Sequence, residues 1–181
     1  LRYLLGKNPG YPEQALRADF ARIRARVQAM YSDKTTPDTR LSDDPMKYNP
    51  ASISSLIQLM LGGIHPGHKG SILHCRLRYF DPIKRRAGMP ADVAALVEKL
   101  TNDEVMVTLV NTSQLTVRQV IVQAGGYAEH QFLSATVNGK TRPVNATSLP
   151  IRLAPGAGAK VTFKMKRYAN QPTMAFPWGR N

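Results

Sequence analysis

The strongest constraint on the fold is a change of hydrophobic period that occurs within residues 61–82, LGGIHPGHKGSILHCRLRYFDP. Before this segment the apolar residues recur every three or four positions, which predicts amphipathic helices. After it they mostly alternate with polar residues, which predicts strands. We therefore expect an α+β protein in which a helical segment (residues 1–65) precedes an antiparallel, Ig-like β-sandwich (residues 66–181).

Two helices are expected in the N-terminal segment. The first follows Pro12 and Glu13, which suit a first helical turn, and its apolar stripe consists of Leu16, Phe20, Ile23, Val27 and Met30. The second spans residues 51–61, is apolar on nearly every side, and ends at Gly62 and Gly63. Such a helix needs more cover than two helices and a loop supply, either from the sheet that follows or from additional helices absent from this chain. Residues 1–65 are therefore expected to belong to a larger helical assembly. Because the sequence begins with Leu1 and not with Met, we expect a polypeptide that was processed or cut from a larger one.

The region after residue 72 reads as a series of short strands. Strands are expected at residues 73–79, 105–110, 115–124, 132–137, 140–144, 149–154 and 159–168. Asn138 and Gly139 predict a tight hairpin between two of them. Residues 90–100 carry apolar side chains at helical spacing and predict a short inserted helix. The final segment contains Phe176 and Trp178, which we expect to pack back onto a neighbouring surface.

Composition indicates a folded protein with a strong positive charge. The 181 residues are 43% hydrophobic and carry a formal net charge of +13. No apolar run approaches the roughly 20 residues of a membrane helix, so no membrane span is expected. The positive charge suggests a polyanionic partner. Because the charge is spread along the chain and its densest runs, 84–86 and 164–167, are short, nucleic acid is disfavoured as a partner, whereas an acidic glycan or a solvated basic surface fits.

The histidines of the central segment are the first candidates for chemistry. His65 and His68 are three residues apart in a glycine-rich turn, where imidazoles can act as general acids or bases and glycines let a substrate approach the backbone. The same spacing suits two metal ligands, but no recognised third or fourth ligand follows, so no complete metal site is predicted. A turn with solvated histidines is the third interpretation.

The long connection between the two predicted helices supplies candidate charged groups. Residues 32–50 are rich in aspartate and proline, and loops of this length are often functional. Asp38, Asp43 and Asp44 can supply carboxylates to a site, and Arg40 can clamp an anion. The same residues are also ordinary turn formers and helix caps.

Three other features are expected to be structural. Cys75 lies on the apolar side of an alternating segment, which predicts a buried, inert thiol. Glu129 and His130 are adjacent, so their side chains rarely share a face, and an edge loop is favoured over a site. Asn111 and Asn145 each begin a glycosylation sequon, a pattern that occurs frequently by chance.

The layout resembles a family of multidomain enzymes. A helical segment with one fully apolar helix, a Gly/His loop, and a sandwich that ends with the hairpin LAPGAGAKVTF resemble the C-terminal portion of bacterial enzymes that join an (α/α) toroid to a β-sandwich. Many of those enzymes act on carbohydrates. The resemblance implies a cleft lined by loops between helices, in which acidic and histidine side chains transfer protons. Carried onto this sequence, the resemblance nominates Asp43, Asp44, His65 and His68 as catalytic residues. Arg40 and Lys69 are expected, apart from the resemblance, as substrate contacts.

Two functions are therefore expected from the sequence. The first is a C-terminal fragment or subunit of a larger glycan-processing hydrolase or lyase, whose partner is another protein chain or the remainder of a longer polypeptide. In it this chain contributes the Gly/His loop and a bracing sandwich. The second is a non-catalytic basic module that binds an acidic glycan or nucleic acid. No cofactor is identified by these motifs.

Overall fold

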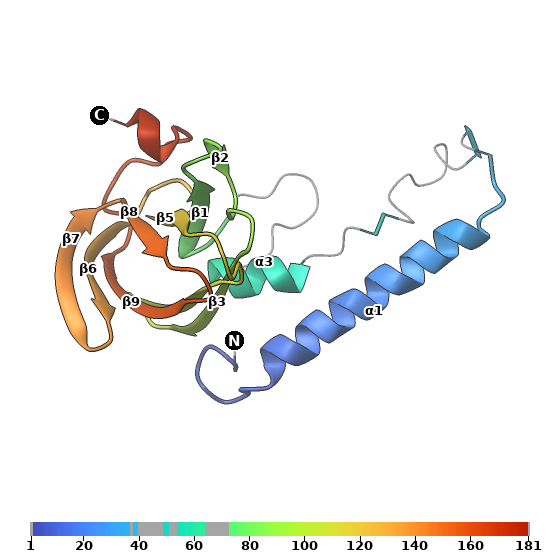
Figure 1. The fold of residues 1–181 in the computed structure, drawn as a ribbon, viewed down its shortest axis with the longest axis horizontal. Coiled ribbons are helices and arrows are strands. Elements are labelled where there is room, and N and C mark those ends of the chain that lie inside the picture. Colours follow the sequence, from blue (N-terminus) through green and yellow to red (C-terminus); the bar gives the residue numbers. More distant parts are fainter. Residues whose placement is uncertain (1, 37, 40–48, 51–53, 64–72, 181) are drawn as a thin grey trace. The chain divides into compact units, whose positions relative to one another are not determined.

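The computed structural model describes residues 2–36, 38–39, 49–50, 54–63 and 73–180 (Figure 1). The chain divides into two compact units: residues 9–56 form one, and residues 1–8 together with 57–181 form the other. The sequence placed the boundary after residue 65. The division falls within the second helix instead, whose last turns belong with the sandwich.

The unit of residues 9–56 is built on the long helix α1 (Tyr11–Ser32), which has a proline in its first turn as expected. Asp19 of α1 is only 5% exposed, and its carboxylate accepts hydrogen bonds from the Ser55 backbone N–H (3.1 Å) and from Arg22. Arg26 donates to the backbone carbonyl of Asn49 at 2.8 Å. Polar contacts from one face of α1 therefore hold the residues that follow the long connection.

Only part of the predicted apolar stripe of α1 is covered: Leu16, Ile23 and Val27 are half-buried. The buried positions of the helix are Ala15 and Asp19, whereas Phe20 is 56% exposed and Met30 48% exposed. Periodicity correctly located the helix. It identified the packed side only in part, because polar contacts of Asp19 and Arg26 also contribute to that side.

Helix α3 (Ser54–Leu61) covers the described part of the predicted second helix. Leu59 is buried, but Leu56 is 39% exposed. The helix ends as expected at Gly62, whose φ of +61° is strained for other residues. At Gly63 a Cβ atom would lie 2.1 Å from the carbonyl oxygen of His74, so glycine is required for the helix end to approach the segment before the first strand.

The sandwich consists of two antiparallel sheets (Figure 1). One sheet has the strand order β2-β1-β5-β8 and the other the order β3-β4-β9-β6-β7. The strands are β1 (Leu77–Asp81), β2 (Arg86–Ala87), β3 (Val93–Leu100), β4 (Glu104–Asn111), β5 (Arg118–Ala124), β6 (Gln131–Val137), β7 (Lys140–Ala146), β8 (Ser148–Leu153) and β9 (Gly158–Lys166). A short 3₁₀ helix, η1 (Pro177–Gly179), lies near the C-terminus. This confirms the predicted α+β class with an N-terminal helical segment and an antiparallel β-sandwich.

The core lies between the two sheets and draws alternate residues from each. Leu77, Val120 and Val122 of one sheet and Val107 and Phe163 of the other are all fully buried. The Phe163 ring stacks on that of Phe132 with a centroid distance of 4.3 Å. The predicted hairpin is also confirmed: Asn138 and Gly139 have positive φ and connect β6 to β7.

The helix predicted at residues 90–100 is wrong, because this segment is the edge strand β3. β3 pairs antiparallel with β4, and its register shifts between Val97 and Lys99 at a β-bulge. Val93, Ala95 and Val97 face the core with a period of two, and the extra residue then brings Leu100 to the same face. The spacing of Val93, Val97 and Leu100 therefore imitates a helical repeat.

Candidate functional site

The residues predicted to carry catalysis and substrate binding lie outside the described residues. They are Arg40, Asp43, Asp44, His65, His68 and Lys69. The structure therefore neither brings them together nor separates them, and the catalytic assignment stays a prediction. Asp38 is described and exposed.

The described residues show no metal centre. Among them, no group of three or more histidine, cysteine, aspartate or glutamate side chains is arranged to hold an ion. Cys75 is 7% exposed, and burial raises the pKa of its thiol to about 12, with the charge of Glu129 as the second cause. This confirms the predicted buried thiol, which is protonated at neutral pH and therefore a poor nucleophile.

Asn111, the start of one sequon, has a structural role. Its side chain is fully buried at the end of β4, and its Nδ2 donates to the carbonyl oxygens of Thr116 (2.8 Å), Ala154 (3.0 Å) and Leu153 (3.3 Å). Asn111 Oδ1 accepts from the Ser113 N–H at 3.1 Å. The amide therefore joins the β4–β5 loop to the end of β8 and is inaccessible for glycosylation in the folded protein.

Glu129 and His130 form a structural corner between β5 and β6, and their side chains lie close together although the residues are adjacent in sequence. Glu129 Oε2 accepts from the Tyr127 backbone N–H at 2.8 Å, and His130 Nδ1 accepts from the Tyr168 backbone N–H at 3.1 Å. His130 is 2% exposed, and burial is the main reason that its pKa is lowered. The two side chains hold the loop and the chain that follows β9.

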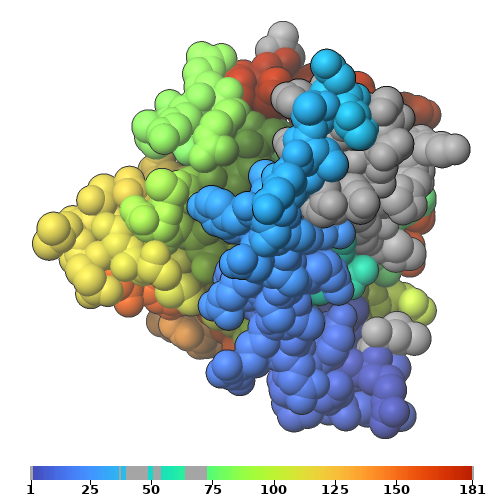
Figure 2. Space-filling model, turned by 90° about the vertical axis from the view of Figure 1, so that its right-hand side faces the viewer, coloured from blue at the N-terminus to red at the C-terminus, as the bar shows by residue number. Residues whose placement is uncertain are grey.

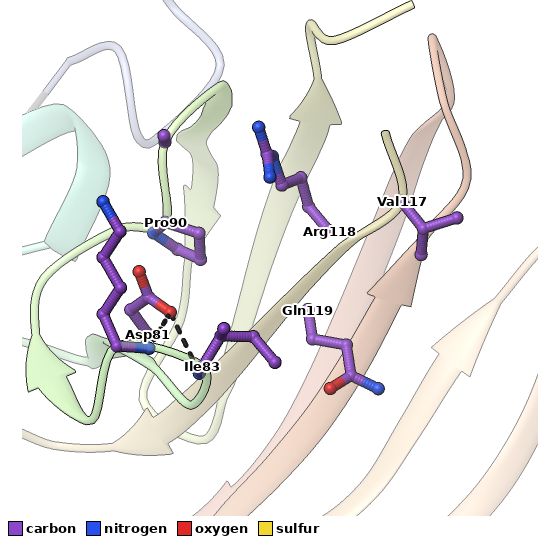
Figure 3. Close-up of a pocket in the computed structure, with 8 residues that line it drawn as sticks. Asp81, Ile83, Pro90, Val117, Arg118 and Gln119 are labelled. Atoms are coloured by element: carbon purple, nitrogen blue, oxygen red, sulfur yellow. Dashed lines mark hydrogen bonds between the residues drawn. The ribbon is translucent and has the colours of Figure 1, made fainter. Parts of the chain in front are cut away.

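A small cavity lies beside the β1–β2 turn (Figure 3). Its volume is about 80 Å³, well below the roughly 300–1,000 Å³ of typical small-molecule sites. Asp81 at its base accepts backbone N–H groups from Ile83 (3.1 Å) and Lys84 (3.0 Å), as Figure 3 shows. On the other side Arg118 pairs with Asp92. The cavity is therefore too small for a substrate, and Asp81, the carboxylate that lines it, is used to shape the turn.

The most developed surface feature combines this turn with the C-terminal segment (residues 168–180). Lys84, Arg85 and Arg86 are exposed on the turn, and the Arg85 guanidinium lies over the Trp178 ring, 5.8 Å from its centroid. Trp178 in turn stacks on Phe176 with a centroid distance of 5.0 Å and an interplanar angle of 5°. We call these five residues the cationic–aromatic surface. Figure 2 shows the turn (green) and the C-terminal segment (red) side by side on one face.

The turn is held in place by Asp81 and by ion pairing. Asp81 is 3% exposed, and besides its two backbone bonds it lies 3.7 Å from the Arg86 guanidinium. Arg86 also donates to the Met89 carbonyl at 3.0 Å. Arg85 has a positive φ of +48°, which turns the chain between β1 and β2. Arg86 is thus tied to the scaffold, whereas no polar partner is seen for the side chains of Lys84 and Arg85 among the described residues.

The C-terminal segment is held by polar and aromatic contacts with the sheet that contains β1 and β5. Arg180 donates to the buried Gln123 side chain at 2.6 Å and to the Ala175 carbonyl. The Phe80 ring lies beside the stacked pair and perpendicular to both rings, at centroid distances of 5.9 Å from Phe176 and 6.0 Å from Trp178. Phe80 is consequently 2% exposed although it points away from the core between the sheets. This confirms that Phe176 and Trp178 pack on a neighbouring surface.

The basic and the aromatic residues of the cationic–aromatic surface can each be recognised in the sequence. That they lie close together in the fold cannot. The basic run 84–86 and the aromatic pair were each evident, yet they are about ninety residues apart in the chain. Comparison with known proteins adds no assignment, because no protein-family model, no curated protein and no solved structure matches the chain. Within the described residues, neither helix has the length and apolar character that crossing a membrane requires.

Proposed function

We propose that the β-sandwich is a non-catalytic module that binds acidic glycans through the cationic–aromatic surface. The observation that carries the proposal is the placement of Arg85 over Trp178, beside the exposed Lys84. A glycan with carboxylate or sulfate groups offers anions to the two cations, and the C–H-rich face of a sugar ring packs on an aromatic face. The exposed fraction of Phe176, 42%, leaves part of the stacked pair open to such a ring.

An acidic glycan fits this surface better than a nucleic acid does. Proteins that bind single strands line a long groove with cations and stack successive bases on several aromatic side chains. Here one stacked pair and one short basic run form a compact patch. A short stretch of two or three sugar units matches that extent.

The test uses the whole chain and two charge-matched variants. Lys84→Gln/Arg85→Gln removes two cations from the cationic–aromatic surface, and Lys164→Gln/Lys166→Gln removes two exposed cations from β9 in the other sheet. Binding to a polyuronate and to a sulfated oligosaccharide is measured by calorimetry at 50 and 200 mM NaCl. Removing two charge-assisted contacts is expected to weaken binding at least tenfold. The β9 variant should weaken it less than threefold.

Three outcomes would contradict the proposal. Equal loss in both variants would mean that net charge alone attracts the ligand. Absence of binding to either glycan at 50 mM NaCl would remove the acidic-glycan assignment. Tighter binding of a single-stranded oligonucleotide with the same dependence on Arg85 would replace it by a nucleic-acid function.

A second proposal concerns the helical segment: that the chain is part of a larger glycan-processing enzyme, with His65 and His68 on a loop of its cleft. Its support is a set of three large apolar side chains that are exposed on α1 and α3. Phe20 is 56% exposed, Tyr31 83% and Leu56 39%. Contiguous exposed apolar side chains mark surfaces that another protein covers, and the proposal requires that these three belong to one such patch.

This second proposal is tested separately from glycan binding. A stable, well-dispersed monomer of the isolated chain in sedimentation experiments would count against a missing partner. In the intact assembly, the His65→Ala/His68→Ala variant should lose glycan-processing activity while the thermal unfolding temperature is retained. Unchanged activity would remove the catalytic role of the loop.

A further inference from the structure

The C-terminal segment leaves β9 alongside the β5–β6 loop and is bonded to it three times. The Tyr168 N–H donates to His130 Nδ1 (3.1 Å), the Asn170 N–H to the Glu129 carbonyl (3.2 Å), and the Thr173 N–H to the Tyr127 carbonyl (2.8 Å). The Asn170 side chain adds a bond to the His130 carbonyl at 3.2 Å. Only the first of these acceptors, a ring nitrogen, titrates near neutral pH.

The geometry fixes the state that His130 must have. Nδ1 accepts a hydrogen bond from a backbone N–H and therefore carries no proton of its own. Once the ring is doubly protonated, two N–H donors face each other and the bond is lost. The Tyr168 ring packs edge-on against the imidazole at 4.8 Å, so the ring has little room to turn away.

The charged groups around His130 act in both directions. Glu129, whose Oε1 lies 3.8 Å from Nε2, favours the imidazolium, whereas Arg76 before β1 and Arg167 after β9 disfavour it. Desolvation is the largest effect and also disfavours it, so the pKa of His130 in the docked state is lowered. The ring is therefore expected to protonate more easily once the C-terminal segment has left and water reaches it.

We infer that His130 is a pH-sensitive latch for the C-terminal segment. Acid favours release of residues 168–180, and release removes Phe176 and Trp178 from the cationic–aromatic surface. The latch stands on the geometry alone. Its consequence, weaker glycan binding in acid, rests on the proposed function.

The direction and size of the effect follow from linkage. Because the pKa of the docked histidine is lowered, the latch is fully effective above the ordinary histidine pKa of about 6.5 and is weakened as pH falls below it. While the docked ring stays unprotonated, the ratio of released to docked segment rises about tenfold between pH 7.5 and pH 5.5.

Amide hydrogen exchange on the ligand-free protein tests the latch. Protection of the Tyr168, Asn170 and Thr173 amides, corrected for intrinsic exchange, is expected to fall about tenfold between pH 7.5 and 5.5, while amides of β4 keep theirs. His130→Asn places a carbonyl oxygen near the position of Nδ1 and removes the titrating group. In this variant the protection of the same three amides should change less than twofold between pH 7.5 and 5.5. His74→Asn, at an exposed histidine, should behave as the unmodified chain does.

Constant protection of the three amides in the unmodified chain would refute the latch, and this result needs no variant to fold. A tenfold fall that persists in His130→Asn would assign the effect to another group and also refute it. Because no glycan is present, failure of the binding proposal leaves these results intact.

Discussion

Replacing Asn111 by Asp changes one atom and removes both side-chain donors from a fully buried site. At pH 7 the carboxylate of Asn111→Asp accepts but cannot donate, so it faces the carbonyl oxygens of Thr116, Leu153 and Ala154 without a hydrogen. Each buried carbonyl left unsatisfied costs about 1–3 kcal/mol. The loss of both N–H donors and the burial of a poorly compensated charge predict a loss of roughly 3–5 kcal/mol from a typical unfolding free energy of about 5–15 kcal/mol.

Urea unfolding at pH 7 measures this loss, and Asn145→Asp is the matched control because Asn145 is exposed. The control should change the unfolding free energy by less than about 0.5 kcal/mol. At pH 4 the introduced carboxyl group is protonated and regains one donor, so the difference between Asn111→Asp and the unmodified chain should narrow. A variant within about 1 kcal/mol of the unmodified chain at pH 7, or one whose deficit is unchanged in acid, would refute the assignment of Asn111 as the hydrogen-bond centre of this end.

Three further predictions follow from individual contacts. Because the pKa of the Cys75 thiol is raised to about 12, a thiol reagent at pH 8 should label the protein only in urea, at a rate set by unfolding; rapid labelling of the native protein would contradict its burial. Gly63→Ala should destabilise the fold by about 1–3 kcal/mol, since its new methyl group would collide with the His74 carbonyl, whereas Gly179→Ala meets no atom within 4 Å and should be silent in thermal unfolding. Phe163→Ala should cost about 3–5 kcal/mol in urea unfolding, because it empties a fully buried position stacked on Phe132; a cost below about 1 kcal/mol would mean that the core closes around the cavity.

Those features of the fold that depend on a few neighbouring residues can be predicted from the sequence. The Asn138-Gly139 turn selects a two-residue hairpin by its own backbone preferences, and the glycines after Leu61 end a helix by theirs. β3 shows the opposite case. Its bulge between Val97 and Lys99 depends on pairing with β4, and a single chain segment carries no sign of that partner. When a bulge adds one residue to a strand, the spacing of its core-facing residues changes from two to three and resembles the spacing on a helix.

The cationic–aromatic surface could not be predicted from the sequence for a related reason. Each half is visible as composition, a basic run and an aromatic pair, but their proximity depends on how β1, β5 and the C-terminal segment pack. The same limit applies to Asp19, whose burial on α1 depends on a bond to Ser55 from the other end of a long connection. Polar residues at such contacts interrupt the apolar stripe from which a buried face is inferred.

Side chains of the C-terminal segment contribute both to the stability of the fold and to the proposed glycan binding. A variant that tests binding must therefore leave the stability unchanged. Trp178 shields Phe80 and also stacks under Arg85, so Trp178→Ala would expose an aromatic ring of the sheet as well as remove a ligand contact. A binding loss in that variant would therefore not separate the two effects. Arg85→Gln leaves Phe80, Phe176 and the Arg180–Gln123 bond in place. Weaker glycan binding by this variant, at unchanged urea stability and unchanged protection of the Thr173 amide, can only arise from the lost cation.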